Sequence, residues 1–233
     1  MTKELQIVIP VYNEEESLKP LIDDWRTLLN SMSLDYQFVL IDDGSTDRSL
    51  EILQTYQRTS PDIVVYNQIN AGHGPAILSG YNTCTAQWIL QIDSDHQLKP
   101  DAFPLFWQAR GQYDLLLGER REKYAAPARR FISLASRSLL RSLFGDHGPR
   151  DVNCPYRLFR GPALHQALPH IPPHSFAPNV LLTAWFVHKH MRILTIPVSP
   201  NDTISPRKSR INGYFIRGSL RALLQTFLFR FRI

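Results

Sequence analysis

Residues 5–29 read LQIVIPVYNEEESLKPLIDDWRTLL and combine three patterns that decide the fold. The continuous apolar run Leu5–Ile9 is typical of a strand covered on both faces of a parallel sheet. The polar stretch Pro10–Glu14 follows, and apolar residues then recur at helical spacing from Leu18 to Leu29. A strand, a polar loop and an amphipathic helix in this order form the repeating unit of an α/β fold.

The same order recurs through the first half of the chain. A helix is predicted over about 48 to 58, with Thr46 or Asp47 as its cap, and another begins at Gly74-Pro75, where the missing proline N–H costs nothing. The alternation predicts an α/β fold with a mostly parallel sheet flanked by helices on both faces. Beyond Leu5–Ile9, the predicted strands are Phe38–Ile41, Ile63–Tyr66, Trp88–Ile92 and Leu115–Leu117.

Four polar clusters follow directly on predicted strands. The carboxyl ends of parallel strands meet along one edge of a sheet, and open α/β sheets bind ligands there, so the clusters predict one site. Taken alone, Asp42–Asp47 could equally be a turn and a helix cap. The four clusters are Pro10–Glu14, Asp42–Asp47, Asn70–Gly74 and Asp93–Gln97.

The sharpest cluster is Asp93-Ser94-Asp95, at the end of the apolar run WILQI. Alternate residues of an extended segment share a face, so both carboxylates can point at one ligand, and Gln97 continues the alternation. Carboxylate oxygens suit Mg²⁺ or Mn²⁺, which commonly bridge a few carboxylates to substrate phosphates. The alternative interpretation is a solvated acidic turn.

The charge of the chain is divided unevenly between its halves. The 233 residues carry a net charge of +5 and are 43% hydrophobic, which excludes disordered, collagen-like and disulfide-scaffold classes. Residues 1–117 hold 7 Lys or Arg and 16 Asp or Glu, a balance of −9, whereas residues 118–233 balance at +14. This asymmetry predicts an anionic partner held mainly by the second half.

The second half contains basic amphipathic stretches. Ala128–Phe144 is predicted as a basic helix, residues 161–175 as a connecting loop and Asn179–His190 as another helix. Residues 211–233 combine bulky apolar residues with arginines and contain no acid, as expected of a helix in an anionic membrane interface. The alternative is a helix that packs on the domain with its arginines at the rim.

The sequence indicates a reduced compartment and no membrane span. Cys84 and Cys154 lie in unlike contexts and form no CxxC pair, so neither a zinc site nor a disulfide framework is indicated. No stretch reaches the roughly 18 to 20 apolar residues of a spanning helix. We expect a cytoplasmic protein that is peripheral on the cytoplasmic membrane face, with an integral membrane protein as a further partner.

Four ordered segments, PVYNEEESL, VLIDDGSTDRS, NAGHGPAILSG and QIDSDHQLKPD, together resemble glycosyltransferase family 2. The resemblance is greatest to its dolichol-phosphate mannosyltransferase-like branch, the polyprenyl-phosphate glycosyltransferases. It covers residues 4–120 strongly and continues weakly through GERRE, DVNCPYRLFR and residues 207–210. It implies a single GT-A type, Rossmann-like nucleotide-diphospho-sugar transferase domain over 1–204, divided into a nucleotide-sugar half 1–117 and an acceptor half 118–204, before a basic loop and amphipathic helix in 205–233.

The resemblance also implies roles for individual residues. The acids of the DxDxQ segment would hold the metal and the sugar diphosphate, with Asp95 as the firmest ligand. Two arginines, Arg120 and Arg157, match arginines of the branch and would bind the acceptor phosphate together with Arg130 and Arg137. The donor-site candidates are Pro10, Tyr12, Glu14, Asp42, Asp43, His73, Ser94, Arg207, Lys208 and Arg210, and the candidate metal ligands are Asp93, Asp95 and Gln97.

The chain departs from the branch at several of these positions. His73 stands where Lys is usual, Ser94 replaces the commoner Ala, and Cys154-Pro155-Tyr156 replaces Ser-Gly-Phe. These changes keep the donor site but leave the sugar and the acceptor open. Without the resemblance, Arg120 and Arg157 could be surface charges and His73 could cap a turn.

A missing acid favours a phosphate acceptor. Relatives that glycosylate a hydroxyl need a general base, because an alcohol is a poor nucleophile at neutral pH. Residues 162–198, where that acid would lie, contain no Asp or Glu. A phosphate is already anionic and needs arginines to bind it. The expected reaction is inverting transfer from a GDP- or UDP-linked sugar to a polyprenyl phosphate at a membrane surface, with Mg²⁺ or Mn²⁺.

Other functions remain as alternatives. A saccharide or other hydroxyl acceptor would require a carboxylate from elsewhere in the fold. A non-catalytic nucleotide-sugar or lipid-binding assembly partner is the alternative from another class, although the intact DxDxQ disfavours it. A dinucleotide oxidoreductase would need a third spaced glycine in Gly72–Gly74. Nucleic acid is not expected as a partner, because the acidic half would repel its phosphates.

Overall fold

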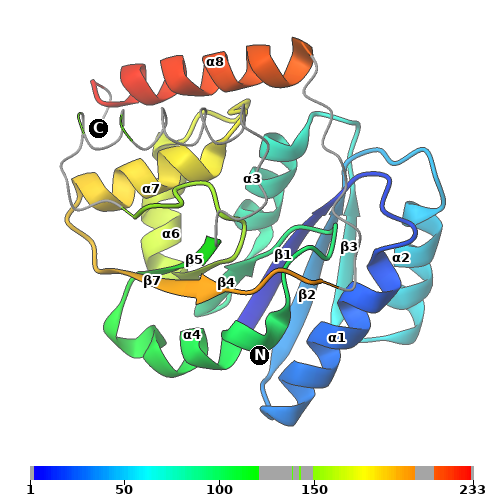
Figure 1. The fold of residues 1–233 in the computed structure, drawn as a ribbon. Coiled ribbons are helices and arrows are strands. Elements are labelled where there is room, and N and C mark those ends of the chain that lie inside the picture. Colours follow the sequence, from blue (N-terminus) through cyan, green and yellow to red (C-terminus); the bar gives the residue numbers. More distant parts are fainter. Residues whose placement is uncertain (1–2, 121–137, 139–141, 143–148, 203–212, 232–233) are drawn as a thin grey trace.

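A computed structural model describes residues 3–120, 138, 142, 149–202 and 213–231 (Figure 1). Its centre is a seven-stranded sheet in the order β3-β2-β1-β4-β6-β5-β7. The first four strands in this order are parallel, β6 is antiparallel to both of its neighbours, and β5 and β7 are parallel to each other. The strands are β1 Leu5–Val11, β2 Tyr36–Asp42, β3 Ile63–Asn67, β4 Trp88–Gln91, β5 Leu115–Arg120, β6 Arg157–Arg160 and β7 Ile193–Val198.

Helices cover both faces of this sheet. One face packs against α1, α2 and α4, and its core includes Trp25 and Phe103, whose rings meet edge to face at 5.5 Å between centroids. The other face packs against α3, α6 and α7, around Tyr81 and Phe159. The helices are α1 Leu18–Ser31, α2 Ser49–Thr59, α3 His73–Thr83, α4 Phe103–Ala109, α6 Gly161–Ala167, α7 Pro178–His188 and α8 Gly213–Phe229.

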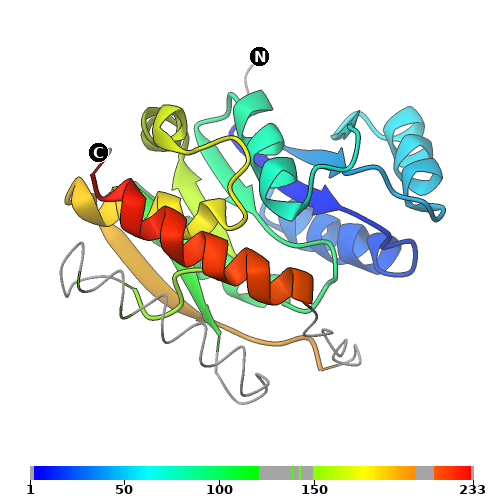
Figure 2. The same cartoon turned by 90° about the horizontal axis from the view of Figure 1, so that it is seen from above.

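The C-terminal helix α8 lies across the outside of α7 in both ribbon views (Figure 1 and Figure 2). Its inner face is fixed by Gly218, where an added Cβ would lie 2.2 Å from the ring of Phe176, and by the buried Phe229. Its outer face exposes a stripe of bulky apolar side chains at helical spacing. The stripe consists of Leu220, Leu224, Phe227, Leu228 and, just beyond the helix, Phe231.

The expected α/β architecture is confirmed, including all five predicted strands. The prediction of a loop over 161–175 was wrong, because α6 and a 3-10 turn, Leu168–His170, occupy its first ten residues. Proline in the first turn of both elements is compatible with a helix, and the buried Leu164 and Leu168 hold them on the sheet. The predicted helix 128–144 lies outside the described residues, apart from two isolated positions.

The cap of α2 also differs slightly from the prediction. The helix begins at Ser49, so Arg48 occupies the N-cap position, and no side-chain cap bond is formed from it. Asp47 nevertheless accepts the N–H of Ser49 at 2.9 Å. The carboxylate therefore binds the first backbone donor of the helix from one residue further away than predicted.

The strand directions bring several charged residues to one edge. The carboxyl ends of β1, β2, β4 and β5 meet along this edge, where β6 begins because it runs in the opposite direction. In the sheet register, Arg157 at the start of β6 is opposite Gln91 at the end of β4. The edge therefore combines loops from the acidic half with arginines from the basic half.

Candidate active site

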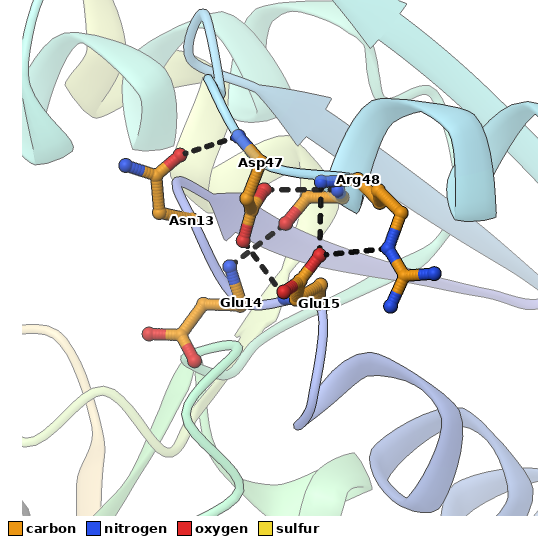
Figure 3. Close-up of polar contacts among 6 residues, drawn as sticks. Asn13, Glu14, Glu15, Asp47 and Arg48 are labelled. Atoms are coloured by element: carbon orange, nitrogen blue, oxygen red, sulfur yellow. Dashed lines mark hydrogen bonds and ion pairs between the residues drawn. The ribbon is translucent and has the colours of Figure 1, made fainter.

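Two loops of the acidic half are held together at the carboxyl edge. Figure 3 shows the contacts between the loop after β1 and the loop after β2. The Asn13 side-chain oxygen accepts the N–H of Thr46 at 2.8 Å, and Asp47 accepts the N–H of Glu15 at 3.2 Å. In return, Glu15 accepts the N–H of Arg48 at 3.0 Å. These reciprocal bonds fix the mutual position of two loops expected to bind the nucleotide.

Asn13 makes this arrangement with an unusual backbone. Its φ is 56°, in the left-handed region that few residues other than Gly adopt, although Asn tolerates it well. Its own N–H donates to Ser45 Oγ at 3.1 Å. The neighbouring Glu14 N–H donates to Ser49 Oγ at 2.8 Å, and the Glu14 side chain is buried. The first loop is thus bonded to the second at three successive residues.

The paired acids at the end of β2 have different environments. Asp43 accepts three donors: the Gln68 side-chain amide at 2.7 Å and the backbone N–H groups of Ala71 and Gly72 at 2.9 and 2.8 Å. This carboxylate therefore shapes the loop that begins α3. Asp42 is fully buried and accepts the N–H of Ser45 on Oδ2, while its Oδ1 has no hydrogen-bond partner within the described part of the chain. A buried acceptor of this kind suits a ligand N–H or O–H.

Two further donor-site candidates lie on or directly after β1. Pro10 is buried inside the strand and pairs in register with Ile41. Tyr12 follows the strand with 48% of its surface exposed. An exposed aromatic face of this kind is suited to stack on a planar ligand group.

The DxD segment follows β4 directly. Asp93 Oδ1 accepts the side-chain N–H of Gln91 at 3.0 Å, and His73 Nε2 at the start of α3 lies 3.4 Å from the same oxygen. Asp95 accepts the backbone N–H of Gln97 at 3.2 Å. Ser94 between the acids is buried. The structure thus brings Asp93, Asp95 and His73 to one place at the carboxyl edge.

The donor set fits a hard divalent cation that is shared with a ligand. No cluster of three or more His, Cys, Asp or Glu side chains able to hold a metal occurs among the described residues. Two part-exposed carboxylates, Asp93 and Asp95, make an incomplete shell. Mg²⁺ and Mn²⁺ complete such shells with water and phosphate oxygens. The residues present therefore suit a metal held jointly with a diphosphate.

Arg120 lies at the same edge, at the end of β5. Its guanidinium forms a two-point ion pair with Asp151, through Nε to Oδ2 at 2.7 Å and Nη2 to Oδ1 at 3.0 Å. Burial opposes its charge, but Asp151, and with a smaller effect Asp93, outweigh this and raise the pKa of Arg120. A fixed cation of this kind near Asp93 can bind an anionic group.

Arg157 is placed differently from the expectation that it binds an acceptor. Its side chain is fully buried, and its guanidinium donates to the backbone carbonyls of Cys154, Asn179 and Val152 at 2.9, 3.0 and 3.1 Å. The donors that would bind a phosphate are therefore directed at the protein itself. Arg157 therefore links the segment before β6 to α7 through these hydrogen bonds.

The chain returns to the DxDxQ segment after β7. Asn201 N–H donates to the carbonyl of Gln97 at 2.8 Å, and Lys99 N–H donates to the carbonyl of Ser199 at 3.2 Å. These bonds place Asn201 beside Gln97, the last residue of the motif. Five candidates from the sequence analysis lie outside the described residues: Arg130, Arg137, Arg207, Lys208 and Arg210.

Three residues of the site were not predicted from the sequence. Asp151, the partner of Arg120, is one of few acids in a basic half, and that isolation was a usable signal. Gln91 is a buried polar residue in an otherwise apolar strand. Asn179 is buried on α7 and hydrogen-bonded to Gln91 at 2.9 Å, for which the sequence carries no signal.

Comparison with known proteins agrees with this geometry. A dolichyl-phosphate beta-glucosyltransferase of Trichomonas vaginalis is 29% identical over 226 residues, which cover 90% of this chain and 69% of that protein. An undecaprenyl-phosphate 4-deoxy-4-formamido-L-arabinose transferase of Edwardsiella ictaluri is 32% identical over 167 residues, 70% of this chain and 51% of that protein. The chain thus spans about half the length of the second relative. Both relatives are polyprenyl-phosphate glycosyltransferases, which confirms the resemblance to that branch.

Solved structures support the fold. Glucosyl-3-phosphoglycerate synthase from Mycobacterium tuberculosis superposes with a TM-score of 0.71 at 19% identity, over 98% of this chain and 78% of that one. A TarS fragment from S. aureus superposes with a TM-score of 0.57 at 17% identity, over 84% of this chain and 58% of that one. The family model described as glycosyl transferase family 2 matches residues 6–166. The chain therefore belongs to glycosyl transferase family 2 and is a glycosyltransferase.

Proposed function

We propose that this glycosyltransferase moves a sugar from a nucleotide-diphosphate sugar to the phosphate of a polyprenyl lipid, with inversion at the anomeric carbon. The names of its two relatives, a dolichyl-phosphate and an undecaprenyl-phosphate transferase, support a polyprenyl phosphate as the acceptor. The observation that carries the proposal is the cation Arg120, oriented by Asp151 close to Asp93. Residues 162–198 supply no Asp or Glu as a general base, which an anionic nucleophile does not need.

The donor would lie across the two bonded loops. Tyr12 would stack on the base, and the buried Asp42 Oδ1 would accept a base or ribose donor. Asp93 and Asp95 would hold Mg²⁺ or Mn²⁺, which neutralises the charge that develops on the leaving diphosphate. A neighbour by fold was solved with Mn²⁺ and UDP, which supports this metal chemistry. Arg207, Lys208 and Arg210 would close over the diphosphate, as the resemblance to the polyprenyl-phosphate branch implies.

The reaction needs no proton transfer at the acceptor. An oxygen of the lipid phosphate forms a bond to the anomeric carbon, while the bond from that carbon to the donor phosphate oxygen breaks. The electron pair of the broken bond leaves with the nucleoside diphosphate. Arg120 would hold the acceptor phosphate in line, together with Arg130 and Arg137. For Arg157 we propose a supporting role, because its guanidinium is buried.

The apolar stripe of α8 would bring the enzyme to its lipid. Leu220, Leu224, Phe227, Leu228 and Phe231 are 44–74% exposed on the face opposite to Gly218 and Phe229, and Arg217 and Arg221 are exposed as well. An exposed apolar stripe beside arginines fits an anionic bilayer interface. No helix in the described part of the chain is long and apolar enough to cross a membrane. We therefore propose peripheral binding at the cytoplasmic face, through α8.

Vesicle sedimentation tests the role of α8. Leu224→Glu should reduce binding to vesicles with anionic lipid, whereas Leu105→Glu should not, because Leu105 is equally exposed but lies on α4, on the opposite face of the sheet. Wild-type binding by Leu224→Glu would overturn the membrane role. Point substitutions are preferable to deletion of the helix, since Phe229 belongs to the core.

Transfer assays test the reaction. Wild-type protein, a panel of UDP- and GDP-sugars and Mn²⁺ are incubated with a polyprenyl phosphate or with the matching polyprenol. Transfer to the phosphate but not to the alcohol is expected, and Asp95→Asn or chelation should abolish it. Equal transfer to the alcohol would favour a hydroxyl acceptor. Binding of a nucleotide sugar without transfer to either lipid would favour the non-catalytic alternative.

A further inference from the structure

A buried chain of hydrogen bonds runs from α3 and α7 to Asp93. The Tyr81 hydroxyl donates to Asn179 Oδ1 at 3.2 Å, Asn179 Nδ2 donates to Gln91 Oε1 at 2.9 Å, and Gln91 Nε2 donates to Asp93 Oδ1 at 3.0 Å. Tyr81 and Gln91 are fully buried, and Asn179 is 3% exposed. We propose that Gln91 and Asn179 are positioning residues that hold the Asp93 carboxylate ready for a divalent cation, an inference that rests on the proposed function.

The Asp93 carboxylate, at the end of this series of hydrogen bonds, fixes the direction in which each bond is donated. Burial raises the pKa of the Tyr81 phenol well above its usual range, so this group keeps its proton and can donate. If the Asn179 amide were reversed, Gln91 would have to turn its oxygen toward the Asp93 carboxylate, and two acceptors would face each other. Only the observed direction pairs a donor with an acceptor at each of the three bonds.

Asn179, in the middle of this series of hydrogen bonds, is held in place by residues that form no hydrogen bond to Asp93. The backbone carbonyl of Asn179 accepts Arg157 Nη1 of β6 at 3.0 Å, whereas the bond that it accepts from Thr183 Oγ1 at 2.8 Å lies within α7 and links the helix to no other element. Arg157 is opposite Gln91 in the β4–β6 pair. The start of α7 is therefore fixed relative to the end of β4, where the carboxylate is presented. This gives the buried guanidinium a role without contact to a substrate.

The contacts select one oxygen of Asp93. Within the described residues, both contacts of this carboxylate, the Gln91 amide and the His73 ring, engage Oδ1. Oδ2 is then the oxygen left to bind a cation. A carboxylate held in this way does not need to lose rotational freedom when the cation binds, and loss of such outer partners typically weakens metal affinity by about 10- to 100-fold.

Direct metal binding tests the inference without an activity assay. Mn²⁺ affinity is measured by electron paramagnetic resonance, with UDP or GDP present, for wild type, Asn179→Leu, Gln91→Met and Thr183→Val. Thr183→Val is the matched control, because it removes a buried bond to the same residue of α7 but leaves the amide chain intact. We expect about tenfold weaker binding for the first two variants and wild-type binding for the control.

The outcomes separate this inference from the proposed function. A folded Asn179→Leu with wild-type Mn²⁺ affinity would overturn the positioning role, and Gln91→Met carries the test if Asn179→Leu does not fold. Equal weakening by Thr183→Val would also overturn it, since the effect would then be general to α7. If wild type binds no more Mn²⁺ than Asp95→Asn with either nucleotide, the metal assignment in the proposed function fails, and the inference fails with it.

Discussion

Arg120 and Asp151 form a two-point ion pair in which the carboxylate meets both Nε and Nη2 of the guanidinium. The partners lie 31 residues apart, at the end of β5 and before β6. The Asp151 side chain is only 14% exposed, against 46% for Arg120. The largely buried Asp151 carboxylate thus orients the more exposed guanidinium of Arg120.

Loss of this anion should impair the acceptor step. We expect Asp151→Asn to lower kcat/KM for the polyprenyl phosphate by about tenfold, because Arg120 loses a charged hydrogen-bond partner. The KM for the sugar nucleotide should not change. Asp202→Asn, which changes an exposed acid of the same half, is the control. A raised donor KM with unchanged acceptor kinetics would contradict the assignment.

Asp47 should make the stability of the two bonded loops dependent on pH. Partial burial opposes its charge, but hydrogen bonds from Ser49 and Glu15 outweigh burial and lower the pKa of this carboxyl. Since the folded state holds the lower pKa, the stabilisation is present above about pH 4 and is lost as the pH falls through the folded value. Asp47→Asn should lower the free energy of unfolding at pH 7 by about 1 kcal/mol.

Urea unfolding at several pH values measures this effect. The difference between wild type and Asp47→Asn should begin to shrink below about pH 4 and disappear once the pH is below the folded pKa of Asp47, where both side chains are uncharged. Asp23→Asn is the control. Asp23 forms an exposed i,i+4 ion pair with Lys19, and such a pair contributes only about 0.3–0.5 kcal/mol to the free energy of unfolding. A difference that stays constant with pH would show that charge is not the cause.

Gly74 should tolerate no side chain. A Cβ at this position would lie 2.0 Å from the carbonyl oxygen of Ser175, which is backbone and cannot rotate away. We expect Gly74→Ala to lower the free energy of unfolding by about 1–3 kcal/mol. At Gly111 an added Cβ meets nothing within 4 Å, so Gly111→Ala should be neutral or stabilising by up to about 1 kcal/mol. Equal stability of the two variants in urea would contradict the packing argument.

The two cysteines should be inert in the folded protein. Cys84 and Cys154 are buried, and burial raises the pKa of each thiol to about 12. A thiol without its thiolate form is a poor nucleophile. Iodoacetamide at pH 8 should leave the native protein unmodified and modify both residues in guanidinium chloride, as measured by mass spectrometry. Modification of either thiol before unfolding would contradict this expectation.

Hydrophobic patterning was sufficient to predict the strands β1 to β5 but not β7, which is parallel to β5. Strands such as Leu5–Val11 are buried at every residue, and the predicted runs therefore coincide with them. Patterning failed for β6, whose four residues RLFR place charges at both ends. It also failed for α6, where Pro162 and His165 suggested a loop although the remaining residues pack on the sheet.

The edge that carries the site could be predicted, but its internal bonds could not. Asp42 and Asp93 follow strands, and a residue that follows a parallel strand must lie at the carboxyl edge. The bond between Gln91 and Asn179 joins residues 88 apart, and its existence depends on how α7 packs over β4. No local pattern encodes such a contact, just as none assigned Arg157 to the interior.

The strand order also separates charge across the molecule. Strands β3, β2, β1 and β4 come from the acidic half, whereas β6 and β7 come from the basic half. Within residues 118–120, 149–202 and 213–231, nine side chains are Lys or Arg and three are Asp or Glu. The sheet therefore makes the folded protein a permanent electric dipole. Within about a Debye length, roughly 8 Å at physiological salt, an anionic surface would exert a torque that turns the basic side toward it before any contact forms.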